Sequence, residues 1–167
     1  MKMTSAEAAK ILRQLKDEYN TITMTERNSK EFNAAVNEDV EELRPEYDYT
    51  ETQQKLDEIE AKIRKLKHTI NVFNATTEVG EFGMTIDQVL IYIPQLSKRI
   101  NKLYGMMSIL PKRRCQSNSY SNIIDYTYAN YDVAQAKADY ERLNDTLARL
   151  QTALDLVNST VTMEVEL

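Results

Sequence analysis

The sequence predicts a mainly α-helical protein, an antiparallel helical bundle or coiled coil of about four helices with a small β element. Apolar residues recur at alternating steps of three and four, most regularly over residues 132–161, which is typical of a coiled-coil seam. Only three Gly and three Pro occur in 167 residues, which favours a few long helices over many short strands. Alternating apolar and polar residues predict short strands near 32–37, 122–129 and 161–167.

Composition and charge predict one helical domain over residues 1–167, located in the cytoplasm. A chain of this length can bury one core. The net charge of −5 argues against bulk attraction to nucleic acid or to anionic membranes. Cys115 is the only cysteine, so no disulfide framework forms and a reducing compartment is indicated. The N-terminus turns polar at once and no run approaches the roughly 20 apolar residues of a membrane span, so we expect no export signal and no membrane association.

A first helix is expected to begin at Thr4 or Ser5 and to end near residue 28. Thr4 and Glu7 have the spacing of a capping box, in which each side chain satisfies a backbone N–H at the start of the helix. An apolar seam follows, and it ends where Glu26 occupies the next position due. The seam residues are Ala8, Leu12, Leu15, Tyr19 and Ile22, with Ile11 widening the face.

Residues 30–50 are expected to connect the first helix to the second. Alternation over 32–37 predicts a short strand, and residues 38–42 are acidic. Arg44 precedes Pro45, and a residue before proline disfavours helical geometry. We therefore expect no helix to continue through this position.

A second helix is predicted from about residue 50 to residue 74. Its acidic residues lie early and its basic residues lie late, which complements the helix macrodipole and gives the basic residues a structural explanation. His68, the only histidine, falls on the outward side of this helix. The seam residues are Leu56, Ile59, Ile63, Leu66, Ile70 and Phe73.

A third helix follows residues 76–83, a connection with two of the three glycines that predicts a small hairpin around Gly80. Residues 85–88 have the capping-box pattern, Pro94 should kink or split the helix after one or two turns, and Pro111 ends it. Two apolar rows make its face wider than a coiled-coil seam, so this helix should contact two neighbours. The rows are Ile86, Ile93, Ile100 and Met107, and Val89, Leu96, Leu103 and Leu110, with Leu90 and Tyr104 between them.

The last third of the chain is predicted to contain a basic loop, a tyrosine-rich strand, the longest seam and a terminal strand. Residues 112–114 are the loop, and the strand over 122–129 contains Tyr126 and Tyr128. Asn130 or Asp132 is expected to cap the last helix, and Asp132 has Gln135 three residues later. Four leucines of its seam are the predicted oligomer contact: Leu143, Leu147, Leu150 and Leu154.

Several short motifs resemble a bacterial family of small helical, coiled-coil-rich proteins without a characterised function, some of which are named septicolysin. The matching segments lie at residues 70–74, 84–88, 113–114, 128–132 and 150–158, so the resemblance spans about residues 50–165. It implies a helical fold and supplies no catalytic residues. The name septicolysin would imply pore formation, for which this chain offers neither an export signal nor a spanning segment.

No pattern predicts a catalytic residue, a cofactor or a metal site. His68 stands alone, whereas a metal site needs several converging ligands. Arg113 and Arg114 would favour a nucleophilic thiolate at Cys115, but the only histidine lies far away in sequence, so an unreactive thiol in a loop is favoured.

Two functions follow from these observations. The first is a non-enzymatic structural or interaction protein that self-associates through its seams as a homodimer or higher oligomer, or that binds another protein. The alternative is nucleic-acid or phosphate binding by Lys112, Arg113 and Arg114, with bases stacking on Tyr126 and Tyr128. The basic loop also has a structural interpretation, pairing with the acidic residues 38–42 or with a partner subunit, and the net negative charge favours it.

Overall fold

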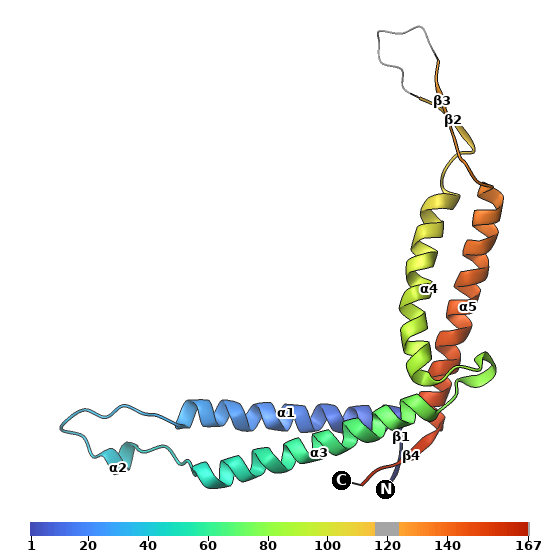
Figure 1. The fold of residues 1–167 in the computed structure, drawn as a ribbon. Coiled ribbons are helices and arrows are strands. Elements are labelled where there is room, and N and C mark those ends of the chain that lie inside the picture. The colour runs from blue at the N-terminus through green and yellow to red at the C-terminus, as the bar shows by residue number, and fades with distance from the viewer. Residues whose placement is uncertain (116–123, 167) are drawn as a thin grey trace. The chain divides into compact units, whose positions relative to one another are not determined.

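The structure is a computed structural model, which describes residues 1–115 and 124–166. The described part of the chain is mainly helical, with five α-helices and two small antiparallel sheets, so the predicted fold class is confirmed. The chain forms two compact units (Figure 1). Unit 1 comprises Met1–Asn74 and Asn158–Leu167, and unit 2 comprises Ala75–Val157. The single domain over residues 1–167 stays a prediction.

Unit 1 is built on two antiparallel helices that lie side by side, α1 (Ser5–Ser29) and α3 (Tyr49–Thr76) (Figure 1). Glu26 near the end of α1 accepts hydrogen bonds from the Tyr47 hydroxyl (2.7 Å) and from Gln53 (2.6 Å), at the start of α3. The predicted capping box of Thr4 and Glu7 begins α1. Both long helices of this unit therefore lie where the sequence predicts them.

The seams of unit 1 are buried to different degrees. In α3, Ile59, Leu66 and Phe73 are buried at intervals of seven residues, as the heptad pattern requires. Within Ser5–Ser29, all of which the structure describes, Ala8 is the one buried residue. The other seam residues of α1 are half-buried, as are Ile63 and Ile70 of α3. One helix pair thus covers only part of the seam that α1 carries.

The ends of the chain form a small sheet in unit 1. Strand β1 (Lys2–Thr4) pairs antiparallel with β4 (Thr162–Glu164), and it buries Met3 and Met163 as direct partners. The predicted terminal strand is confirmed at residues 162–164, and residue 167 lies outside the described residues. A three-residue β1 is too short to show alternation, so the sequence analysis missed it.

The strand predicted over residues 32–37 is wrong, because this segment is irregular. Val36 is fully exposed, and Phe32 lies beneath the Arg44 guanidinium, 5.6 Å from the ring centre. Alternation alone does not make a strand, since a strand also needs a neighbour that accepts and donates its backbone hydrogen bonds. A short helix, α2 (Val40–Leu43), follows instead, and Arg44, the residue before Pro45, is extended, as the proline predicts.

Unit 2 is built on a second pair of antiparallel helices, α4 (Ile86–Met107) and α5 (Val133–Thr160) (Figure 1). The ring centres of Tyr104 and Tyr140, one from each helix, lie 5.9 Å apart. Asp132 caps α5 by accepting from the backbone N–H of Ala134 at 2.8 Å, as predicted. The side chains buried between the helices come from both apolar patterns: Ile86, Val89, Leu96, Ile100, Ala136, Leu143, Leu150 and Leu154.

Pro94 does not split α4, contrary to one of the two expectations, since the helix is continuous from Ile86 to Met107. Pro94 lies on the exposed side, where water can satisfy the carbonyl that its missing N–H leaves free. The helix stops four residues before Pro111, and the Ser108 hydroxyl donates to the Tyr104 carbonyl at 2.8 Å.

The connection before α4 is a compact turn, as the two glycines predict. Glu78 and Thr85 form an isolated antiparallel bridge around the 3-10 helix η1 (Gly80–Phe82). Gly80 and Gly83 both have positive φ angles (49° and 60°), a conformation that costs glycine little. The Arg149 guanidinium of α5 hydrogen-bonds Glu81, which holds the turn against the helix.

Candidate functional site

The first candidate site is a β-hairpin in unit 2. Strand β2 (Lys112–Arg114) pairs antiparallel with β3 (Tyr126–Tyr128). The tyrosine-rich strand is therefore confirmed at residues 126–128, whereas residues 122–123 of that prediction lie outside the described residues. The predicted loop at Lys112–Arg114 is wrong: a strand without apolar residues has no alternating signature, and lysines and arginines are common on exposed edges.

One face of this hairpin combines positive charge with aromatic rings. Lys112 pairs with Tyr128 and Arg114 pairs with Tyr126, and side chains of paired residues project from the same face of a sheet. The Lys112 ammonium lies 4.1 Å from the centre of the Tyr126 ring and 5.4 Å from that of Tyr128. All four side chains are exposed. We call these four residues the basic–aromatic face.

The opposite face of the hairpin carries Arg113, Cys115 and Thr127. The Cys115 sulfur lies 3.0 Å from the Thr127 hydroxyl oxygen, and the Cys115 N–H donates to the Asp125 carbonyl at 2.9 Å. A threonine hydroxyl is not a base that deprotonates a thiol at neutral pH. This geometry therefore supports a structural role for Cys115.

A mostly apolar hollow of about 500 Å³ lies where the hairpin leaves the helices. Two hydrogen bonds hold the hairpin there: Ala129 N–H donates to the Pro111 carbonyl at 3.0 Å, and the Tyr131 hydroxyl donates to the Met106 carbonyl at 2.8 Å. Ile109 and Leu110 line the hollow and are themselves exposed, together with Arg113 and Thr127. The hollow can hold an apolar side chain beside a positive charge.

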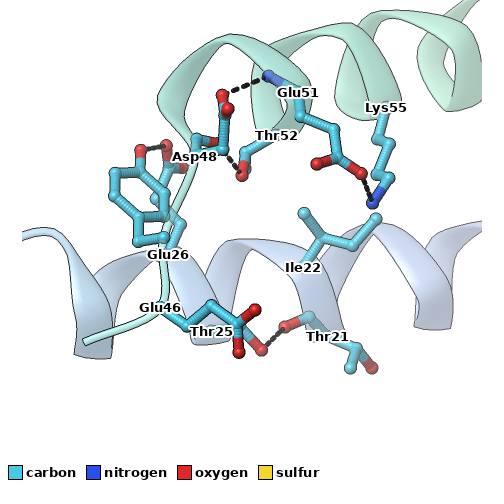
Figure 2. A pocket seen from close by; sticks show the side chains of 10 residues that line it. Thr21, Ile22, Thr25, Glu26, Glu46, Asp48, Glu51, Thr52 and Lys55 are labelled. Carbon is cyan, nitrogen blue, oxygen red and sulfur yellow. Dashed lines mark hydrogen bonds and ion pairs between the residues drawn. The ribbon is translucent and has the colours of Figure 1, made fainter.

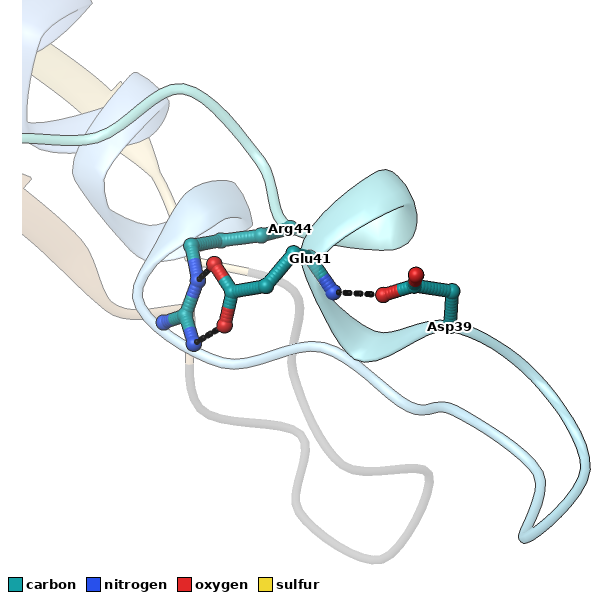
Figure 3. Close-up of polar contacts among 3 residues, drawn as sticks. All are labelled: Asp39, Glu41 and Arg44. Carbon is teal, nitrogen blue, oxygen red and sulfur yellow. Dashed lines mark hydrogen bonds and ion pairs between the residues drawn. The ribbon is translucent and has the colours of Figure 1, made fainter.

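The second candidate site is an acidic segment in unit 1, residues 38–46. It contains Glu38, Asp39, Glu41, Glu42 and Glu46 and one basic residue, Arg44. Glu41 binds the Arg44 guanidinium through both carboxylate oxygens, at 2.8 and 3.0 Å (Figure 3). Arg44 holds the pKa of Glu41 below its usual range, mainly through this hydrogen bond.

Two further acidic residues of this segment have structural roles. The Asp39 carboxylate accepts from the Glu41 N–H at 2.9 Å and so caps α2, as Figure 3 shows. Glu38 accepts from the Ala35 N–H at 2.7 Å. The acidic segment therefore keeps a defined conformation although it is exposed, and the charge of its one base is already paired.

Next to this segment, α1 and α3 enclose a polar hollow of about 450 Å³ (Figure 2). Its polar groups are largely paired with one another: Glu26 accepts from Tyr47, Glu51 pairs with Lys55, and Asp48 caps α3 through the Glu51 N–H at 2.9 Å. The hydrogen bond to Glu26 raises the pKa of Tyr47 to about 12. These contacts fix the start of α3, so the hollow has a structural explanation.

The predicted site residues fall into two groups. Lys112, Arg113, Arg114, Tyr126 and Tyr128 meet on one hairpin. The four leucines of the predicted oligomer contact lie on α5 and not on the hairpin. Leu143, Leu150 and Leu154 are buried inside unit 2, and Leu147 is half-buried.

The positions of the histidine and of the acidic residues bear on whether the chain could hold a metal ion. His68 lies exposed on α3. Across residues 1–115 and 124–166, no group of three or more His, Cys, Asp or Glu is arranged to hold a metal ion. The apolar hollow was not predictable from the sequence, because it depends on the segment after α4 meeting β2, β3 and the segment after β3 in space.

Comparison with known proteins places the fold but not the function. The sequence matches no protein-family profile and no curated protein. The structure is similar to the crystal structure of a functionally unknown conserved protein from Corynebacterium diphtheriae, with 19% identity and a TM-score of 0.59. The match covers 98% of this chain and 100% of that one. It shows the fold shared with an uncharacterised bacterial protein and does not support the name septicolysin.

In the part of the chain that the structure describes, no helix combines the length and the apolar character that crossing a bilayer requires.

Proposed function

We propose that this chain is a non-enzymatic structural or interaction protein of the cytoplasm that self-associates through its heptad-patterned helices. The supporting observation is α1, which carries a complete seam but, within Ser5–Ser29, buries only Ala8. Leu12, Leu15, Tyr19 and Ile22 stay half-exposed beside α3. Because a seam gains most of its stability from burial, a helix of a second copy would complete the packing.

The outer side of α4 supports the same proposal. Leu90 and Tyr104 lie 14 residues apart, which places them on one stripe of the helix, and both are exposed, as is Ile91. The sequence predicts two neighbours for α4, and α5 is one of them. The exposed stripe is available to a second neighbour.

Light scattering after gel filtration tests this proposal with a matched pair of variants. Leu15→Gln with Ile22→Gln removes the half-exposed apolar area of the α1 seam, so we expect the molar mass to fall to that of a monomer. Met24→Gln changes an apolar residue of α1 that is exposed off the seam, so it should leave the mass unchanged. Circular dichroism of both variants shows whether the helices remain. A native chain that is monomeric throughout would contradict the proposal.

The basic–aromatic face supports a second function, binding of single-stranded nucleic acid or phosphate. Lys112 lies over two tyrosine rings, and cationic and aromatic side chains together recognise the backbone and the bases of a single strand. Fluorescence anisotropy with labelled oligonucleotides at low salt is the test. This function predicts salt-sensitive binding that Arg113→Ala with Arg114→Ala abolishes. The absence of binding by the native chain would exclude it.

Membrane lysis, the activity that the name septicolysin implies, is not part of this proposal. Charged residues occupy most of the circumference of α1, α3 and α5, and α4 carries four more, whereas a helix that enters the membrane interface needs a large apolar face without them. We expect no release of dye from liposomes exposed to the native chain. Release would reinstate the lytic function.

A further inference from the structure

The β2–β3 hairpin carries cations on both of its faces, and the apolar hollow adjoins the face of Arg113 and Thr127. Over residues 111–115 and 124–128, the hairpin carries three cations, Lys112, Arg113 and Arg114, and one anion, Asp125. Among the described residues, none of these three cations forms an ion pair with an acidic side chain. Exposed apolar side chains lie beside them, including Leu110, which is 63% exposed. A partner for this surface must therefore be acidic and partly apolar.

The distribution of charge over the chain identifies an acidic surface in unit 1. Unit 2 contains nine Lys and Arg and nine Asp and Glu, so it has no net charge. From totals of 21 and 26, this leaves 12 basic and 17 acidic residues in unit 1, which therefore carries the whole net charge of −5. Five of these acids lie in residues 38–46.

The acidic segment also has the apolar residues that the hairpin surface requires. Val40 and Leu43, which are 46% and 45% exposed, flank Glu41 and Glu42 there. The base of this segment, Arg44, is already bound by Glu41. The segment therefore presents uncompensated negative charge interleaved with apolar side chains, which complements the hairpin in both respects.

We propose that the β2–β3 hairpin of one copy binds the acidic segment, residues 38–46, of a second copy. The inference rests on the proposed self-association and adds a second contact to it, in which one surface meets a different surface. In the head-to-tail arrangement that we propose, each copy uses its hairpin on one neighbour and its acidic segment on another, so the contact adds copies beyond two. Each exposed ion pair is weak and is screened over ~10 Å at ~0.1 M salt, so this contact must weaken as salt rises.

The net charge favours an acidic segment of this chain over nucleic acid as the occupant. The net charge of −5 opposes the approach of a polyanion to the chain, whereas a second copy offers an acidic segment that also carries apolar side chains. A phosphate backbone has no apolar group to place in the hollow beside Arg113, whereas the acidic segment offers the exposed side chains of Val40 and Leu43.

Sedimentation velocity of the full chain at low and high salt tests the proposal through charge reversal. Lys112→Glu with Arg114→Glu reverses two charges of the hairpin, and Glu42→Lys with Glu46→Lys reverses two charges of the acidic segment, which brings its net charge from −4 to 0 and spares the residues that hold its conformation. We expect each double variant to lose the salt-sensitive species larger than a dimer. An equimolar mixture of the two should recover them in part, because the native hairpin of one variant meets the native acidic segment of the other, and the exchanged charges at positions 112 and 114 are opposite to those at positions 42 and 46.

Lys98→Glu with Lys102→Glu is the matched control for the hairpin variant, since it lowers the net charge of the chain by the same amount on the exposed side of α4. This variant should keep the salt-sensitive species. If neither reversal changes the sedimentation of a chain that still associates through its helices, the hairpin contact is wrong and the proposed function stands. If the native chain never associates, both are wrong. If the amount of the salt-sensitive species does not depend on protein concentration, the contact lies within one chain. If the chain binds an oligonucleotide and this binding leaves its self-association unchanged, the hairpin is assigned to nucleic acid. Either result overturns the inference.

Discussion

The Lys112 ammonium lies 4.1 Å from the centre of the Tyr126 ring, a diagonal contact across the two strands of the hairpin. An exposed cation–π contact of this kind contributes about 0.5–1 kcal/mol. Strands of three residues have few backbone hydrogen bonds, so side-chain contacts across the strands carry much of the stability of the hairpin.

Tyr126→Ala should loosen the hairpin without unfolding unit 2. The loss of the cation–π contact predicts that the amide of Cys115, which donates to the Asp125 carbonyl, exchanges about two- to five-fold faster. Hydrogen exchange followed by NMR measures this rate. Tyr49→Ala, an exposed tyrosine at the start of α3, should leave it unchanged. Equal exchange in Tyr126→Ala and the native chain would show that the ring contributes nothing.

Asp132→Ala should destabilise the protein by about 1 kcal/mol, because the Asp132 carboxylate caps the start of α5. Urea unfolding monitored by circular dichroism gives this difference in free energy. Asp132→Asn is the control, since asparagine caps a helix about as well as aspartate. A loss of stability that is as large in Asp132→Asn would show that charge, rather than capping, is responsible.

Leu150→Ala should cost about 2–5 kcal/mol, because Leu150 is 0% exposed at the centre of the α5 seam and its truncation leaves a cavity. Leu90→Ala makes the same chemical change on α4 at a side chain that is 49% exposed, so we expect a cost below about 0.5 kcal/mol. Thermal and urea unfolding of the two variants provide the comparison. Similar losses at both positions would contradict the burial of the seam within one chain.

The stability of unit 1 should fall as the pH rises above 10. The hydrogen bond to Glu26 raises the pKa of Tyr47 to about 12 in the folded chain, above its ordinary value of 10.0. The stabilisation is therefore fully present below pH 10 and is lost between pH 10 and about 12, as the unfolded state releases this proton first. Unfolding experiments across that interval measure the effect. Tyr47→Phe should reduce the fall in stability over this pH interval, and Glu42→Gln should not. An equally steep fall in Tyr47→Phe would show that Tyr47 is not the group responsible.

The helices were predictable because their signals are local. The capping pairs Thr4–Glu7 and Thr85–Gln88 and the cap Asp132 each act over two or three residues, so the sequence alone locates the starts of α1, α4 and α5. The heptad pattern likewise identifies the buried side of α5, where Leu143 and Leu150 lie. These parts of the fold need no knowledge of distant residues.

The strands and the candidate site were only partly predictable because they depend on distant pairing. Met3 pairs with Met163 across almost the whole chain, and three residues of β1 show no alternation that would reveal it. Val36 lies in a segment that alternates well but has no neighbouring strand, so no strand forms there. Arg114 meets Tyr126 only because β2 and β3 pair, and this pairing converts a predicted basic loop into a basic–aromatic face.

Light scattering of the native chain over the micromolar concentration range at low salt tests the central proposal, self-association, most directly. The half-exposed seam of α1 predicts a weight-average mass that rises with concentration to at least twice the 19.4 kDa of one chain. A mass that stays at 19.4 kDa over the whole range would contradict the proposal.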